Sequence, residues 1–210
     1  MADFDHALSL ESNKQAALHY RGRCLRVMGR FDEAIRDLSA ALDLDPTIAA
    51  ALNDRAWTWR KLGDYAKAID DYTSSLNLRP SAFIHNERAV CHYLSKQHAE
   101  AIADHAAACE LEPSDAGSFN GLAWILATCP IDALRDGPRA VALATRACEL
   151  SNWTDTGFLD TLACAHAESG DFAEAVRCTD KVLELCDPLE QDEYRQRLAQ
   201  FREGKPLRIA

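Results

Sequence analysis

Apolar residues recur at every third or fourth position along this chain, in stretches of about fourteen residues separated by short polar connections. In AALNDRAWTWRKL, residues 50–62, they share one side of a helix. YAKAIDDYTSSLNL, residues 65–78, repeats the pattern just after Gly63. This spacing predicts amphipathic α-helices. Because only a short glycine-containing connection separates two such stretches, we expect successive helices to run antiparallel.

The same helix pair is repeated with a period near 34 residues. The block GRFDEAIRDLSAALDLDP (29–46) returns as GDYAKAIDDYTSSLNLRP (63–80), as KQHAEAIADHAAACELEP (96–113) and as GDFAEAVRCTDKVLELCDP (170–188). Glycine stands at the turn in three of these blocks, and proline follows the second helix, which it cannot continue. The whole chain is therefore expected to be all-α and built from repeated helix pairs.

These blocks resemble tetratricopeptide (TPR) repeats, whose second helix carries an alanine at a fixed position. Five alanines hold that register: Ala34, Ala68, Ala101, Ala140 and Ala175. The resemblance implies a right-handed α-solenoid of antiparallel helix pairs. Its expected parts are the second helix of an incomplete repeat (1–14), repeats at 15–48, 49–81, 82–115, 116–152 and 153–188, and a capping helix with a tail (189–210).

The fourth repeat departs from the pattern, because Ala101 and Ala140 lie 39 residues apart. About five extra residues are expected between its helices, in TCPIDALRDGP, with Pro138 in the first turn of the second helix. With residues 152–176 and the tail YRQRLAQFREGKPLR, this stretch is similar to the C-terminal ends of TPR arrays in bacterial proteins. The resemblance implies a bacterial source.

The opening residues DFDHALSLES match the second helix of the next repeat when shifted by 34 positions. Phe4 then lies on Leu38, and Leu8 lies on Leu42. Either the chain begins with a shortened cap, or it is the C-terminal part of a longer array. The half-repeat is also an expected surface for self-association.

Composition and charge narrow the classes of function. The net charge is −10, and residues 81–188 hold 17 acidic and 7 basic groups, so a nucleic-acid partner is not expected. The start MADFD lacks the basic residues of a secretory signal, and no apolar run approaches the ~18 residues that span a bilayer. We expect a cytoplasmic protein without a membrane partner. The eight cysteines form no CxxC pair and are expected to be core thiols.

Two charged positions vary together from repeat to repeat. Arginine in the first helix is followed 16 residues later by aspartate in the second, which predicts structural ion pairs within each helix pair. In the fourth and fifth repeats both positions lose their charge. The predicted pairs are Arg21 with Asp37, Arg55 with Asp71, and Arg88 with Asp104.

Motifs for catalysis are missing from the sequence. It contains no phosphate-binding glycine loop, no GxSxG and no HExxH, and its histidines lie at spacings that do not suit a metal ion. We expect neither an enzyme nor a cofactor or metal.

The remaining candidate is the groove that first helices line in TPR proteins. By that resemblance the peptide-binding residues are His19, Arg23, Arg26, Asn53, Trp57, Arg60, Lys61, Asn86, Tyr93, Asn120 and Trp124. One register reads His19, Asn53, Asn86, Asn120, Asp160, a polar ladder whose carboxamides suit a peptide backbone. Alternatively, these asparagines bond only to neighbouring helices.

The expected function is a scaffold that binds an extended or helical peptide, with acidic residues near the arginines and an apolar anchor at Trp57 or Tyr93. The carboxylate clamp of TPR proteins that bind chaperone tails is not expected, because Phe83 and Glu87 stand where it needs basic residues. The alternative is a structural or regulatory C-terminal module of a longer TPR protein or enzyme fusion.

Overall fold

The computed structural model describes residues 14–209, which form α-helices, one 3₁₀ turn and no strand. The chain separates into two compact units, residues 1–97 and 98–210. We describe each unit by itself. The predicted half-repeat at residues 1–14 lies outside the described residues, apart from Lys14, which begins the first described helix.

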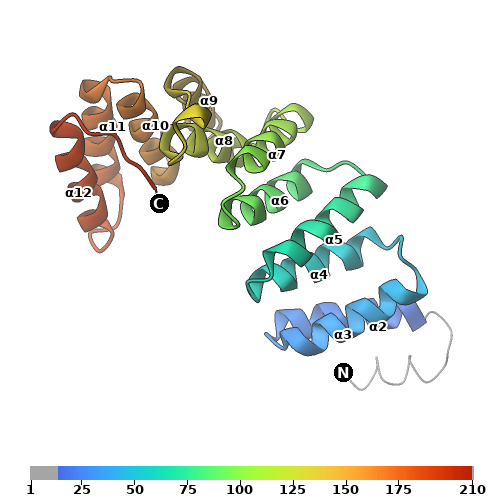
Figure 1. The fold of residues 1–210 in the computed structure, drawn as a ribbon. Helices are drawn as coiled ribbons and strands as arrows, with labels where there is room; N and C mark the ends of the chain where they lie inside the picture. The colour runs from blue at the N-terminus through green and yellow to red at the C-terminus, as the bar shows by residue number, and fades with distance from the viewer. Residues whose placement is uncertain (1–13, 210) are drawn as a thin grey trace. The chain divides into compact units, whose positions relative to one another are not determined.

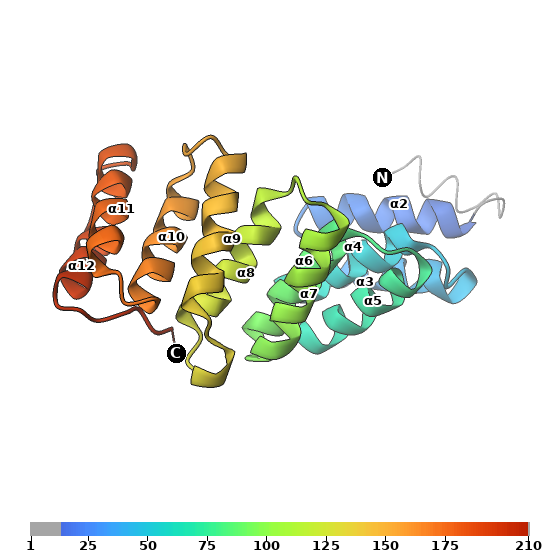
Figure 2. The same cartoon turned by 90° about the horizontal axis from the view of Figure 1, so that it is seen from above.

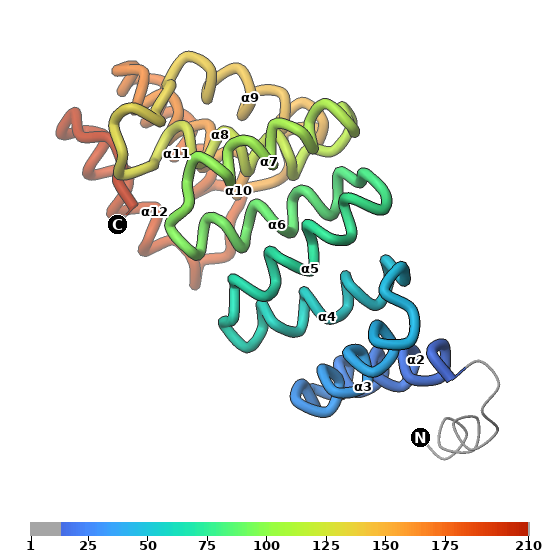
Figure 3. The backbone as a smooth tube through the Cα atoms, turned by 45° about the vertical axis from the view of Figure 1, so that its right-hand side comes forward, coloured from blue at the N-terminus to red at the C-terminus, as the bar shows by residue number. Residues whose placement is uncertain are grey.

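Unit 1 holds two helix pairs and one further helix (Figure 1). Its helices are α2 (Lys14–Val27), α3 (Phe31–Leu44), α4 (Ala49–Lys61), α5 (Tyr65–Leu78) and α6 (Ala82–Leu94). Each helix packs against the next one in α2 to α5, and α5 packs against α6. First helices also touch one another, since α2 contacts α4 and α4 contacts α6. Figure 3 shows the course of these successive helices as a backbone tube.

Unit 2 continues the same alternation with one longer connection (Figure 2). It comprises α7 (His98–Leu111), α8 (Ala116–Thr128), η1 (Asp132–Leu134), α9 (Gly137–Leu150), α10 (Thr156–Glu168), α11 (Phe172–Leu185) and α12 (Gln191–Arg202). The two helices of the predicted third repeat, α6 and α7, fall in different units. The repeat boundaries themselves stay predictions.

Local sequence explains where the helices begin and end. Aspartates cap α5, α8, α9, α10 and α11, each accepting a hydrogen bond from a backbone N–H in the first turn. Gly63 and Gly170 have φ of 81° and 82° at the turn within a pair, a conformation that favours glycine. Lys96 takes the equivalent place with φ of 61°.

Small residues allow the helices of a pair to approach closely. The five marker alanines on the second helices are all fully buried. On α2, Gly22 lies so near α3 that an added Cβ would meet the Leu38 side chain at 2.8 Å. Leucine and aromatic side chains fill the remaining space, as Tyr72 does in unit 1 and Phe201 does in unit 2.

The connection between α8 and α9 spans residues 129–136, where the other helix pairs are joined by three residues. It lies where the sequence places the five extra residues, and Pro138 stands in the first turn of α9. Arg135 holds this connection in place, since its Nε donates to Glu168 Oε1 at 2.9 Å and its Nη1 donates to the Cys129 carbonyl at 2.8 Å.

Among the described residues, 14–209, no helix is long and apolar enough to cross a membrane. All eight cysteines are free thiols.

Candidate functional site

The arginine and aspartate positions that vary together meet within the helix pairs of unit 1. Arg21 donates two hydrogen bonds to Asp37, at 2.6 and 2.7 Å. Arg55 donates two to Asp71, at 2.8 and 2.7 Å, and a third to the Ser39 hydroxyl at 3.0 Å. Both carboxylates are buried. Both arginines therefore join their own helix pair, and Arg55 also reaches back to the preceding helix, α3.

The third predicted pair would join the two units, and it stays a prediction. Within unit 1, Arg88 Nη1 donates to the Thr73 hydroxyl at 2.8 Å. This contact is equivalent to the one between Arg55 and Ser39. The Arg88 guanidinium on α6 therefore points towards the preceding helix, as the Arg55 guanidinium does on α4.

The carboxylate of Asp54, which follows the ladder residue Asn53 on α4, contacts two side chains of α2. Asp54 Oδ2 lies 3.0 Å from His19 Nε2, and Asp54 Oδ1 lies 3.2 Å from Arg26 Nε. His19 is buried and Arg26 is half-buried. Both residues are predicted groove residues, and the structure joins them through an aspartate on the next first helix.

The next first helix repeats this arrangement. Arg60 Nη2 on α4 lies 3.0 Å from Glu87 Oε2 on α6, and the same oxygen accepts a hydrogen bond from the Tyr72 hydroxyl at 3.2 Å. Burial, with a further contribution from Glu87, raises the pKa of the Tyr72 phenol. The phenol therefore stays protonated and remains a donor.

Sequence reasoning missed the neutralising role of Asp54 and Glu87. Both residues directly follow a ladder asparagine, at Asn53 and Asn86, and this repeated Asn-acid pair was the available signal. Two carboxylates thus offset two of the four basic residues in the predicted groove, which are Arg23, Arg26, Arg60 and Lys61. Arg23 and Lys61 supply the remaining positive charge, and both side chains are exposed.

Trp57 lies between cations at the centre of this face. The Arg26 guanidinium is 4.6 Å and the Lys61 ammonium 5.0 Å from the centroid of its ring, both in cation–π geometry. Phe31 meets the indole edge-on at 6.2 Å. Trp57 is half-buried. The predicted apolar anchor is therefore an indole that already holds two positive groups in place.

An apolar pocket of about 330 Å³ opens beside Arg23 on α2. It is lined by Tyr20, Arg23, Cys24, Val27 and Met28. Val27 and Met28 are among the most exposed apolar side chains described, at 75% and 60%. The pocket places apolar surface next to an exposed cation.

The ladder asparagines lie half-buried on α4, α6 and α8. The Oδ1 atoms of Asn53 and Asn120 are buried and accept no hydrogen bond from the described chain. Tyr93 is half-buried on α6. The ladder runs through both units, so its continuity stays a prediction.

In unit 2, Asp160, the last position of the polar ladder, is bonded by the capping helix α12. Arg197 of α12 bonds Asp160, and its second terminal nitrogen donates to Glu193 at 2.6 Å. Both Asp160 and Arg197 are buried. Trp124 is half-buried and packs against the apolar cluster that contains Phe201. The end of this row of first helices is therefore closed by the chain itself.

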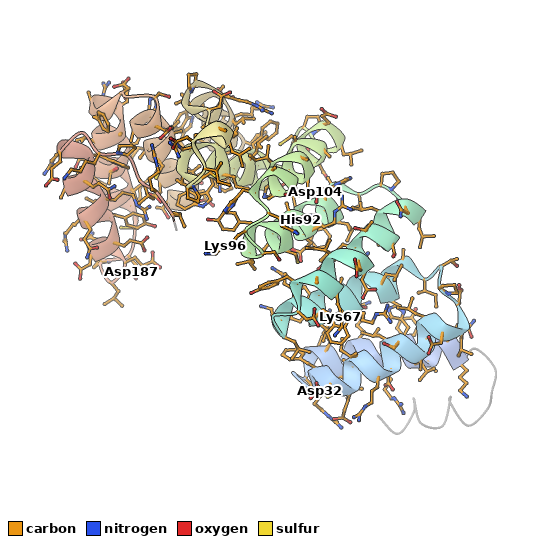
Figure 4. The ribbon with its side chains drawn as sticks, in the orientation of Figure 1. Asp32, Lys67, His92, Lys96, Asp104 and Asp187 are labelled. Atoms are coloured by element: carbon orange, nitrogen blue, oxygen red, sulfur yellow. The ribbon has the colours of Figure 1, made fainter. Side chains whose placement is uncertain are left out.

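A contrasting cation–indole contact lies elsewhere in unit 1. Lys67 on α5, labelled in Figure 4, places its ammonium 4.3 Å from the Trp59 ring and 2.6 Å from Asp64. It resembles the contact between Lys61 and Trp57 in chemistry but belongs to a second helix. It is a matched control for the inner face.

Comparison with known proteins relates part of this chain to a known family. Residues 14–81 match a family model described as tetratricopeptide repeat. A search of curated proteins by sequence finds no significant match.

Solved structures agree with the family model. YrrB, described as a TPR protein with an unusual peptide-binding site, is similar with a TM-score of 0.77 and 16% identity, over 92% of this chain and 96% of YrrB. MamA (41-end) from Desulfovibrio magneticus RS-1 has a TM-score of 0.74 and 19% identity, over 83% and 96% of the two chains. The first TPR of Spaghetti (RPAP3), bound to the HSP90 peptide SRMEEVD, has a TM-score of 0.50 and 26% identity, over 53% of this chain and 90% of that one.

The helix pairs and their buried marker alanines agree with the comparisons: residues 14–81 match the tetratricopeptide-repeat family, and the described chain has the fold of tetratricopeptide-repeat solenoids.

Proposed function

We propose that this protein is a non-catalytic scaffold that binds an acidic peptide segment on the inner face of unit 1. The observation that carries the proposal is the surplus of positive charge around Trp57. Of the four predicted groove cations, Arg26 is paired with Asp54 and Arg60 with Glu87. Lys61 lies over the Trp57 ring and Arg23 lines the pocket on α2, and we assign these two exposed cations to the ligand. Local charge outranks the net charge of −10, because the Debye length is about 8 Å at physiological ionic strength.

The ligand that fits is short and mixed in character. A carboxylate would bind between Lys61 and Arg23, and an apolar side chain would pack on the edge of Trp57 or in the pocket beside Arg23. The Asn53 carboxamide is the polar group available for the peptide backbone. Charge-assisted hydrogen bonds contribute roughly 1.5 to 3 kcal/mol each, so two would dominate the affinity of a short peptide.

Peptide binding by proteins of similar structure supports peptide binding as the class of function. It does not indicate which peptide this chain binds. The structure of YrrB is described with a peptide-binding site, and that of Spaghetti holds an HSP90 peptide. In this chain Phe83 and Glu87 replace the basic residues of a carboxylate clamp, and Glu87 is already paired with Arg60. A chaperone tail is therefore not the proposed ligand.

Selection of random twelve-residue peptides on the full chain tests the proposal. We expect the selected peptides to be enriched in Asp and Glu beside an apolar residue, and to bind more weakly as salt rises. The double variant Arg23→Glu, Lys61→Glu should weaken binding at least tenfold in a fluorescence titration.

The matched control is Lys67→Glu, which reverses the cation over Trp59 and should leave affinity within about twofold. Peptides that bind the double variant as well as the wild type would contradict the proposed site. Equal losses in the double variant and the control would show that only the overall charge matters, and would also contradict it.

A further inference from the structure

The chain does not stop at its capping helix. After α12 it turns at Gly204, whose φ is 71°, and the Lys205 N–H donates to the Gln200 carbonyl at 3.1 Å. Residues 205–209 then run without helical structure back towards α10 and α8, as the dark red segment in Figures 1 and 2 shows. The Pro206 carbonyl accepts a hydrogen bond from the Gln200 side chain at 2.9 Å.

Three consecutive residues of this tail contact unit 2 in three different ways. Leu207 packs against the apolar cluster that contains Leu126 and Phe201. The Arg208 Nη2 atom lies 2.5 Å from Glu168 Oε2 at the end of α10. The Ile209 N–H donates to the Thr128 carbonyl at the end of α8, at 3.1 Å.

The receiving surface is built independently of the tail. The Glu168 side chain is only 12% exposed, and Arg135 from the connection at 129–136 holds its other oxygen. The Thr128 carbonyl belongs to the last turn of α8, where helix carbonyls lack an intrahelical partner. The five extra residues of the fourth repeat thus position the carboxylate that the tail arginine meets.

An apolar anchor, a charged pair and a main-chain hydrogen bond are the contacts by which proteins hold extended peptides. The tail makes all three within three residues, and it lies more than 35 residues away in sequence from Glu168 and Thr128. Leu207 and Ile209 are only half-buried and Arg208 is exposed, so few contacts hold the segment.

We propose that residues 205–209 are a tethered ligand of a binding site formed by α8, α10 and the 129–136 connection, and that this site binds an extended segment of a partner protein with an apolar residue followed by arginine. The tail then covers the site until the partner displaces it. This site belongs to unit 2 and does not depend on the proposed surface of unit 1.

A different protein is a better occupant than a second copy of this chain. A short flexible tether gives the chain's own tail an effective concentration on the order of millimolar. The tail of a second copy is held equally well in its own site and must leave it to exchange. A foreign segment must displace the tail as well, but it does not first have to leave a site of its own.

The test uses the full chain with the double substitution Leu207→Ser, Arg208→Ser, which weakens the tail and leaves Glu168 and Thr128 intact. The probe is the synthetic peptide GKPLRIA, the sequence of residues 204–210, carrying a fluorescent label. We expect it to bind the double variant at least tenfold more tightly than the wild type, whose own tail competes. The peptide GKPLEIA should bind the double variant at least tenfold more weakly than GKPLRIA.

Further substitutions locate the site. Glu168→Gln in the double variant should lower the affinity for GKPLRIA several-fold, whereas Glu184→Gln on the exposed side of α11 should not change it. Circular dichroism and the melting temperature check that each variant is folded. If the double variant does not fold, Arg208→Ser alone replaces it, with a smaller but measurable gain in peptide affinity over the wild type.

Three results would overturn the proposal. A folded variant that binds GKPLRIA no better than the wild type would make the tail a structural strap only. If GKPLEIA bound the double variant as tightly as GKPLRIA, Glu168 would not recognise the arginine of the segment. A stable complex between the wild type and the double variant would assign the segment to a second copy of the chain.

Discussion

The ion pair between Arg55 and Asp71 shows how a single residue depends on its partner. The Asp71 side chain is 9% exposed and the Arg55 side chain 22%. Removing one member of a buried pair leaves the other charge without compensation, whereas replacing both with apolar residues is often neutral. In unit 2 the chain itself uses Leu122 and Leu143 in the same register.

Arg55→Leu is therefore expected to lower the free energy of unfolding by about 2 to 4 kcal/mol, because Asp71 stays buried without its guanidinium. The double variant Arg55→Leu, Asp71→Leu should recover most of that loss. Urea unfolding followed by circular dichroism measures both.

The matched control is Arg30→Leu, since Arg30 forms an exposed pair with Glu33 at 2.7 Å. Its urea midpoint should stay at the wild-type value. A double variant as unstable as Arg55→Leu alone would mean that the ion pair is itself a net source of stability.

At the scale of elements, the three-residue connections from a first helix to a second helix share one backbone conformation. Gly29, Gly63 and Gly170 have φ between 74° and 82°, and Lys96 has φ of 61° at the equivalent point. An L-residue with a side chain pays a steric cost in this region that glycine does not.

Lys96→Gly is expected to stabilise the protein by about 0.5 to 1 kcal/mol, and Gly63→Ala to destabilise it by about 1 kcal/mol. Nothing lies within 4 Å of a Cβ added at Gly63, so its cost is one of backbone conformation alone. Thermal unfolding of the two single variants measures the opposite shifts. A loss of stability in Lys96→Gly would show that the lysine side chain contributes more than its backbone costs.

At the scale of the whole molecule, stability is organised by neighbouring helices. In a repeat protein each helix pair contacts only those beside it, so a perturbation is felt mainly by adjacent elements. Phe201 on α12 is fully buried in the cluster that joins α8, α9, α10 and α11.

Phe201→Ala is expected to cost unit 2 about 3 to 5 kcal/mol, because it leaves a cavity in that cluster. Hydrogen exchange should then accelerate in α9, α10 and α11 and stay unchanged in α2 to α5. Equal acceleration in α2 to α5 would show that both units unfold as one cooperative body.

Helices, turns and the Arg–Asp pairs of unit 1 followed from the sequence, because each depends on residues within about 16 positions of one another and recurs in register. The buried marker alanines are the clearest case. Their spacing alone indicates where two helices must approach, and the structure buries all five.

Tertiary structure alone decided which charges of the candidate site remain available. Asp54 neutralises Arg26 and Glu87 neutralises Arg60 across helices of different pairs, about 30 residues apart in sequence. Sequence periodicity describes one helix at a time and does not give the distance between two such side chains.

The sequence by itself determined a repeated helix pair, its turns and its resemblance to tetratricopeptide repeats, because local periodicity and a fixed register specify them. The docking of Leu207 and Arg208 on α8 and α10, and the capture of Asp160 by Arg197, were decided only by the fold. An irregular segment has no periodicity to read. Its place is set by the apolar surface and the carboxylate that distant helices bring together.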